Sequence, residues 1–220
     1  MRAPALVAVL GIGILGLGQG FGAGYSGAGL LLWDVSALNA ALETAGYPAL
    51  EGSLFLYGGM GAGGEELRFG LGGFGGSLSA HEGARVSQIS LGFGGAVAEV
   101  PFGSAKGFSL CAGALLGAGG AELLLRSRDY GSFGDALSAP SDLYLSRGFA
   151  LALPYISLEF WPVGWLGLRA AVGALIPFLT SPWEADGTAL PGPPGSFGGP
   201  YLTFLVAFGG REAPEEAQAD

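Results

Sequence analysis

The stretch from Phe149 to Phe178 alternates regularly between large apolar positions and small or charged ones. Pro162, Val163 and Gly164 interrupt the alternation, so we predict two antiparallel strands joined by a turn centred on Val163. This turn places large apolar side chains on one face of the hairpin and small or charged ones on the other. Each arm is longer than the roughly 9 to 11 residues that a tilted strand needs to cross a bilayer. The pattern therefore predicts a membrane-crossing hairpin.

Four side chains of this hairpin are candidates for defined roles. Trp161 and Trp165 flank the turn, where a membrane interface would lie and where tryptophan is enriched. Glu159 and Arg169 fall on the face turned away from lipid, and the predicted register makes them diagonal neighbours. We therefore expect a lumen ion pair between them. Near Pro154 the large residues change from odd to even positions, which indicates a β-bulge.

Further strands of the same kind occupy much of the chain. In the last one, from Tyr201 to Phe208, four large residues share one face. The other predicted strands cover 21–32, 54–60, 67–78, 86–100 and 108–125. With both arms of the hairpin, the predicted number of strands is eight.

The connections between these strands alternate in length. They are short after the second, fourth and sixth strands and long after the first, fifth and seventh, and only the short one near His81 departs from the alternation. An even number of strands, with short turns at one end and longer loops at the other, is typical of transmembrane barrels. We therefore predict an all-β, antiparallel up-and-down membrane β-barrel.

One short helix is predicted in the first long connection, over Ser36–Ala45. Asp34 or Ser36 is suited to cap it, and its narrow apolar stripe consists of Val35, Leu38 and Leu42. Because this stripe is short, the helix must pack on another element to persist. Its position after the first strand places it in or over the mouth of the barrel.

The two ends of the chain differ in character from the part between them. Residues 1–20 have a basic start, an apolar middle and small residues at the end, the layout of a secretory signal peptide. Residues 210–220 form a short acidic tail that we predict to be disordered. The barrel domain is accordingly predicted to span 21–209.

Composition agrees with a membrane barrel and disfavours other classes. Charged residues make up 12% of the chain, about half the share of a soluble domain. The 44 glycines are too many for a mainly helical protein. A net charge of -9 without a basic cluster makes nucleic acid an unsuitable partner.

Catalytic and metal-binding patterns are scarce. The lone histidine, His81, falls in a turn beside Glu82, which excludes sites with several histidine ligands. The lone cysteine, Cys111, lies in an apolar run and is expected to be a packed thiol. Glu99, Glu122 and Glu159 lie in apolar strands, where structural ion pairing is the expected role and acid–base catalysis the alternative. We expect no enzyme activity, no cofactor and no metal site.

Four arginines are predicted to ring the loop end of the barrel. Arg85, Arg126, Arg128 and Arg147 fall on adjacent strands at that end, where an arginine band can meet lipid phosphate. Pairing with nearby acidic residues is the alternative. Membrane lipid, including lipopolysaccharide phosphate, is thus the predicted partner.

The Trp-Pro-Val-Gly-Trp turn, the signal-like start and the final YLTFLVAF strand together resemble small outer-membrane β-barrel proteins of diderm bacteria. The chain is also similar to uncharacterised Gly-rich bacterial proteins, which implies no activity. The first resemblance implies an outward apolar belt, loops facing outside, termini in the periplasm, and a structural, adhesive or small-solute role in the outer membrane. Two alternatives are an inner-membrane protein with spanning helices at 108–121 and 163–180, and an exported soluble β domain that binds a partner through an apolar face.

Overall fold

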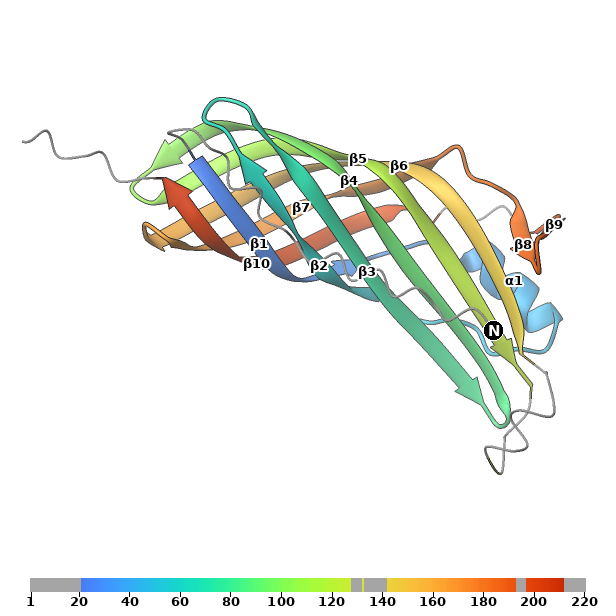
Figure 1. Cartoon of the computed structure of the whole chain (residues 1–220). Helices are drawn as coiled ribbons and strands as arrows, with labels where there is room; N and C mark the ends of the chain where they lie inside the picture. The colour runs from blue at the N-terminus through green and yellow to red at the C-terminus, as the bar shows by residue number, and fades with distance from the viewer. Residues whose placement is uncertain (1–20, 128–131, 133–141, 193–196, 212–220) are drawn as a thin grey trace, which may run out of the picture.

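The computed structural model describes residues 21–127, 132, 142–192 and 197–211 (Figure 1). The predicted signal peptide, Arg128 and the tail after Arg211 lie outside the described residues. About 74% of the described residues lie in strands, and the described part holds a single short helix. The last strand continues through Arg211, two residues beyond the predicted end of the barrel domain at 209.

The fold is a closed antiparallel barrel of eight strands, as predicted. Consecutive barrel strands pair as hairpin neighbours, and the first strand pairs with the last, which closes the barrel. The barrel strands are β1 (Phe21–Leu31), β2 (Leu54–Gly63), β3 (Arg68–Glu82), β4 (Arg85–Ala105), β5 (Phe108–Arg126), β6 (Leu143–Val163), β7 (Leu166–Phe178) and β10 (Gly199–Arg211). We call the end with the connections after β2, β4 and β6 the turn end, and the opposite end the loop end.

The strands are strongly staggered. A path through paired residues starts at Gly22 on β1 and returns at Leu32, one residue past the end of β1. The Leu32 N–H donates to the Pro200 carbonyl at 2.9 Å. The stagger is therefore 32 − 22 = 10 residues toward the loop end. In an eight-stranded barrel such a stagger goes with a strand tilt of roughly 35 to 45°. The path passes through Gly63, Phe69, Ala98, Ala114, Pro154, Ala174 and Pro200.

Large side chains fill much of the interior, whereas the hairpin pattern predicts small or charged residues on the face turned away from lipid. Leu56, Ile89, Leu151 and Leu153, among others, are buried inside. The predicted bulge at Pro154 is also wrong, because the β5–β6 register runs through this residue without a shift. Odd positions of β6 point inward along its whole length. The large residues of β6 change from odd to even positions for another reason. Near the loop end they fill the interior, and near the turn end they form the outer surface.

The outer surface carries a belt of exposed apolar side chains. Phe69 on β3, Phe204 and Phe208 on β10, and Trp165 in the turn between β6 and β7 are each more than half exposed. Outward positions of β5, β6 and β7 add Leu116, Ile156 and Val172. Apolar side chains thus cover the outside of the barrel as well as filling its loop half.

One wall of the barrel continues past the others at the loop end (Figure 1). The β2–β3 pairing ends at Tyr57 and Gly75, whereas the β3–β4 pairing continues to Glu82 and Arg85. Strands β3 to β6 therefore extend as an open sheet, which we call the projecting sheet. Its β6 edge is covered by a small hairpin that the sequence pattern did not predict, β8 (Trp183–Ala185) and β9 (Thr188–Leu190).

The helix α1 (Ser36–Thr44) lies at the loop end of the barrel (Figure 1). Leu38 and Leu42 are buried in the main core, as the stripe predicts. The Asn39 side chain exchanges two hydrogen bonds of 2.9 Å with the backbone of Leu50, which fixes the chain after the helix.

The start of α1 differs from the predicted cap. Val35 is the N-cap residue, and it makes no side-chain cap hydrogen bond. Asp34 instead accepts hydrogen bonds from the Ser36 N–H (3.0 Å) and hydroxyl (2.7 Å). These two hydrogen bonds lower the pKa of Asp34.

Candidate functional site

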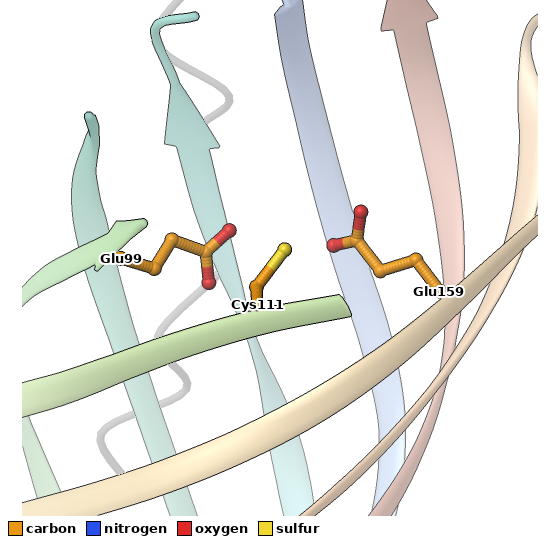
Figure 2. A group of neighbouring side chains, drawn as sticks. All are labelled: Glu99, Cys111 and Glu159. Atoms are coloured by element: carbon orange, nitrogen blue, oxygen red, sulfur yellow. The ribbon is translucent and has the colours of Figure 1, made fainter. Parts of the chain in front are cut away.

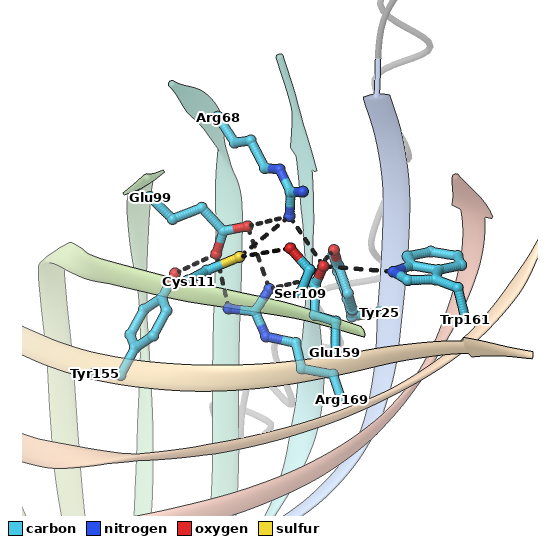
Figure 3. Close-up of polar contacts among 9 residues, drawn as sticks. All are labelled: Tyr25, Arg68, Glu99, Ser109, Cys111, Tyr155, Glu159, Trp161 and Arg169. Atoms are coloured by element: carbon cyan, nitrogen blue, oxygen red, sulfur yellow. Dashed lines mark hydrogen bonds and ion pairs between the residues drawn. The ribbon is translucent and has the colours of Figure 1, made fainter. Parts of the chain in front are cut away.

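Four charged side chains meet inside the turn half of the barrel and form a closed ring (Figure 3). Arg68 Nη1 lies 3.3 Å from Glu99 Oε1 and 3.0 Å from Glu159 Oε2. Arg169 lies on the other side, with Nη2 2.7 Å from Glu99 Oε2 and Nη1 3.0 Å from Glu159 Oε1. We call these four residues the ion ring. Each carboxylate sits between two guanidinium groups, and the four charges sum to zero.

Two cross-strand pairs build the ion ring. Arg68 on β3 lies directly opposite Glu99 on β4, and Glu159 on β6 lies directly opposite Arg169 on β7. Directly opposite side chains on one face of a sheet are close neighbours. All four residues occupy inward positions, so closure of the barrel brings the two pairs together across the lumen.

The ion ring is shielded from solvent. None of its four residues is more than 2% exposed. Removing a charge from water costs several kcal/mol, and only close partners with good geometry offset it. The alternation of two bases and two acids supplies those partners, so removing one charge leaves another without its full set of partners.

Tyrosines complete the coordination of the two carboxylates. The Tyr25 hydroxyl donates to Glu159 Oε1 at 2.7 Å, and the Tyr155 hydroxyl donates to Glu99 Oε2 at 2.9 Å. The Arg68 guanidinium also lies 3.7 Å from the centre of the Phe21 ring. Because β1 and β6 supply these aromatic groups, the network joins strands on opposite sides of the barrel (Figure 3).

A small cavity lies beside the ion ring. It measures about 20 Å³, and Tyr155, Arg169, Tyr201 and Thr203 are among its lining residues. Such a volume holds about one water molecule. The Nε atoms of Arg68 and Arg169 are buried without a hydrogen-bond partner in the described part of the chain.

Glu99, Cys111 and Glu159 are the group of possible metal ligands found among the described residues (Figure 2). Their ligand atoms lie within 4.8 Å of one another. However, Arg68 Nη1 lies between them, at 3.3 Å from Glu99, 3.0 Å from Glu159 and 3.5 Å from Cys111 Sγ. A guanidinium nitrogen thus holds the position that a cation would take. The three residues do not fit a metal ion while Arg68 is in place.

The geometry around the carboxylates favours structure over catalysis. Glu99 and Glu159 each accept hydrogen bonds from both arginines and a tyrosine. His81 is remote from them, because it lies near the loop end of β3 whereas Arg68 begins the same strand. Glu122, the third acidic candidate, points outward and is exposed. The three glutamates therefore do not form one site.

The structure brings Glu159 and Arg169 together, but in a different register from the predicted one. They lie directly opposite rather than diagonally, because the turn is at Gly164 and Trp165 and the register shifts between Phe160 and Val163. Pro162 lacks an N–H and lies in this irregular segment, where a ladder hydrogen bond is not needed.

The two tryptophans of the turn have different surroundings. Trp165 is 63% exposed on the outer surface. The prediction of Trp161 as an interface aromatic is wrong, because its ring packs inward against Phe21 with centroids 5.6 Å apart. Its Nε1 also lies 3.5 Å from Glu159 Oε2. Trp161 therefore covers the turn-end side of the ion ring.

Three of the four arginines predicted at the loop end are described, and each contacts the chain itself. Arg85 Nη1 donates to the Gly46 carbonyl, and Arg126 pairs with Asp142 at 3.3 Å. Arg147 donates to the Ser181 carbonyl at 2.8 Å and to the Thr180 hydroxyl at 2.9 Å. These contacts fasten the loops at this end. Arg128 lies outside the described residues.

The sequence pattern does not predict half of the ion ring. Arg68 and Glu99 were each placed in an apolar strand, and alternation indicates that Arg68 faces away from its large neighbours Leu67 and Phe69. That pattern indicates that Arg68 points inward, but Glu99 shares the odd positions of its strand with Ile89 and Leu91, so alternation gives no such indication for it. It does not show that strands three and four bring them to the same depth as Glu159 and Arg169.

The described chain thus belongs, by fold and interior, to the closed eight-stranded β-barrels with a buried charged network. No helix among the described residues is long and apolar enough to cross a membrane. No protein-family model matches the sequence, and no curated protein does.

Proposed function

We propose that the protein is an outer-membrane β-barrel of a diderm bacterium with a structural rather than a catalytic role. The distribution of side chains carries this proposal. Four charged residues are at most 2% exposed inside the barrel, whereas Phe204 and Phe69 are more than 60% exposed outside it. A charged interior and an apolar belt suit a barrel surrounded by lipid.

The filled interior supports a structural role over solute passage. Apolar side chains occupy the loop half of the barrel and the ion ring occupies the turn half. The inner-membrane helical alternative is wrong, because residues 108–126 and 166–178 form strands. The exported soluble alternative leaves the belt of exposed aromatic residues facing water, which is unfavourable.

One substitution distinguishes lipid from water around the belt. Phe204 points outward from β10, and Phe204→Arg should lower the free energy of unfolding by about 2 to 4 kcal/mol if the site faces the middle of a bilayer. The matched control is Ser79→Arg, on the outward face of the projecting sheet, which should change stability by less than about 0.5 kcal/mol.

The measurement is urea unfolding of the barrel in phospholipid vesicles, with membrane fractionation of the expressing diderm cells beside it. Recovery of the wild-type chain in the outer-membrane fraction, with the expected loss for Phe204→Arg, supports the proposal. A soluble wild-type chain, or equal stability of the two variants, rejects it.

A further inference from the structure

The outer surface of the barrel is hollowed across β2 to β6. The hollow measures about 1300 Å³, and we call it the outer trough. Its lining includes outward positions of five neighbouring strands, from Tyr57 on β2 to Gly148 on β6, and ends at Ser181 and Glu184. It therefore runs across the strands, on the wall from which the projecting sheet continues.

Glycines form the floor of the outer trough. Gly75, Gly92, Gly120 and Gly148 are paired in register from β3 to β6, so they make one continuous row. Tyr57 continues this row on β2, and the Gly148 carbonyl at its other end accepts a hydrogen bond from Ser181 N–H. A Cβ added at Gly92 would have no atom within 4 Å. The trough is thus open space that side chains would otherwise occupy.

The two ends of the outer trough differ chemically. Phe55 and Tyr57, at one end, are 62% and 66% exposed. Glu122 and Glu184, at the other end, belong to a polar row in which Ser90, Glu122, Ser146 and Glu184 are successive partners. None of the ion pairs found among the described residues involves Glu122 or Glu184. One end is aromatic and the other is negatively charged.

The stagger of the barrel places these ends at different heights. A row of paired residues climbs ten residues per turn toward the loop end, so the four strand steps from β2 to β6 climb five. Five residues of a tilted strand correspond to roughly 12 Å along the barrel axis. The aromatic end therefore lies level with the apolar belt, and the acidic end lies above it.

We propose that the outer trough binds a lipid whose head group carries a protonated amine. This inference rests on the proposed membrane location. The acyl chain lies along the glycine floor near Phe55 and Tyr57, and the ammonium group lies between Glu122 and Glu184. The negative charge of the two glutamates selects the positively charged head group. The height difference between the two ends of the trough matches the distance from the hydrocarbon to the polar surface of a membrane.

Lipid retention by the purified full-length chain tests the proposal. Protein in a non-ionic detergent is mixed with phosphatidylethanolamine or with phosphatidylglycerol of the same acyl chains, and bound lipid is counted by native mass spectrometry. These probes share the phosphate and differ in the amine. We expect preferential retention of phosphatidylethanolamine, and a preference at least roughly threefold lower in Glu122→Gln/Glu184→Gln, since two exposed charge pairs are lost.

A second variant fills the trough without touching the acids. Gly92→Leu places a side chain in the open space, and it should reduce retention of both lipids. Its matched control is Gly24→Leu on β1, where an added Cβ also meets no atom within 4 Å and where retention should not change. Heat-dependent gel mobility verifies that each variant folds.

Each outcome decides one of the two proposals. Equal retention of the two lipids by a folded, membrane-embedded wild-type chain overturns the ammonium site and leaves the outer-membrane proposal intact. An unchanged preference in the double glutamine variant, or unchanged retention in Gly92→Leu, also overturns the site. A chain that fractionates as soluble but still selects phosphatidylethanolamine rejects the membrane location alone.

Discussion

At the scale of residues, each charge of the ion ring contacts two charges of opposite sign. Removing one of them therefore leaves its neighbours incompletely paired. Glu159 lies 3.0 Å from both Arg68 and Arg169, and neither arginine has a water-exposed position. A buried, uncompensated charge costs more than the loss of a balanced pair. The stability of the barrel therefore depends on charge balance inside it.

This charge balance predicts that a single variant is less stable than a double variant that removes one acid and one base. Glu159→Gln leaves a net positive charge in the ring and should lower the free energy of unfolding by about 3 to 5 kcal/mol. Glu159→Gln combined with Arg169→Gln keeps the Arg68–Glu99 pair and a neutral interior, so it should cost less. Urea unfolding in vesicles, followed by tryptophan fluorescence, measures both. Glu184→Gln, at an exposed position, is the control, and equal losses in the single and double variants would contradict the ring as a unit.

Two glycines of adjacent strands give a second test at this scale. A Cβ at Gly117 on β5 would overlap the backbone of Gly94 and Gly95 on β4, whereas a Cβ at Gly92 meets nothing within 4 Å. Gly117→Ala should destabilise the barrel by about 1 to 3 kcal/mol, because the strands must move apart. Gly92→Ala should change stability by less than about 0.5 kcal/mol. The same unfolding assay compares them, and similar values for both would reject the close approach.

Residue alternation indicated that Arg68, Glu159 and Arg169 face inward, but not how they combine. Glu159 and Arg169 share one hairpin, so a local pattern was enough to associate them. The register error of two positions arose at Trp161 and Pro162, where the irregularity is set by packing against Phe21. The contacts to Arg68 and Glu99 depend on closure across the lumen, which no local pattern reports.

At the scale of elements, α1 is held by its surroundings rather than by its own hydrogen bonds. A helix of nine residues is marginal in isolation. Two buried leucines, the Asn39 clamp on Leu50 and the Arg85 contact to Gly46 keep it at the mouth. The helix is therefore an attached element whose loss need not open the barrel.

Weakening the buried face of α1 should release it while the barrel persists. Leu38→Ser with Leu42→Ser removes core burial that contributes about 2 to 5 kcal/mol per site. A helix of this length is not stable without that packing. A glutamate-specific protease should then cut after Glu43 or Glu51, and mass spectrometry should detect an otherwise intact barrel. Ala40→Ser with Ala41→Ser, on the exposed face, is the matched control. Cleavage no faster than in this control would show that other contacts hold the helix.

The barrel strands and the helix were predicted nearly at their observed positions, whereas β8 and β9 were not. The barrel strands have long alternating patterns, but β8 and β9 have three residues each. Their position is determined by the β6 edge that they cover. A short strand of this kind is specified by its partner, so its own sequence contains little signal.

At the scale of the whole molecule, buried side chains occupy both halves of the barrel interior in the described part. Buried leucines and aromatic residues fill the loop half, and the ion ring with Trp161 fills the turn half. The cavity beside the ion ring has room for about one water molecule. We therefore expect no sustained open-channel current from purified protein in planar bilayers, with a lipid-only bilayer as control. Stable unitary currents would show that the filling side chains move aside.

The number of strands and the alternation of connections were enough to predict a closed barrel, but not its asymmetry. The stagger of ten residues and the projecting sheet follow from strand pairings that extend over different lengths. Sequence alternation continues along β4 and β6 without marking where their neighbours end. The outer trough results from this asymmetry and was therefore invisible in the sequence.

The pairing of β1 with β10 also has a consequence for the order of assembly. Every other barrel contact joins strands that follow one another, apart from the inserted β8–β9 hairpin, so it closes a comparatively short segment of chain. The seam instead joins Phe21 to Arg211 and must wait for the last strand. Because closing a long loop is entropically costly, hairpins form first and the seam last. Until β10 arrives, β1 and β7 both present unpaired edges, and at this stage the chain is most exposed to pairing with other molecules.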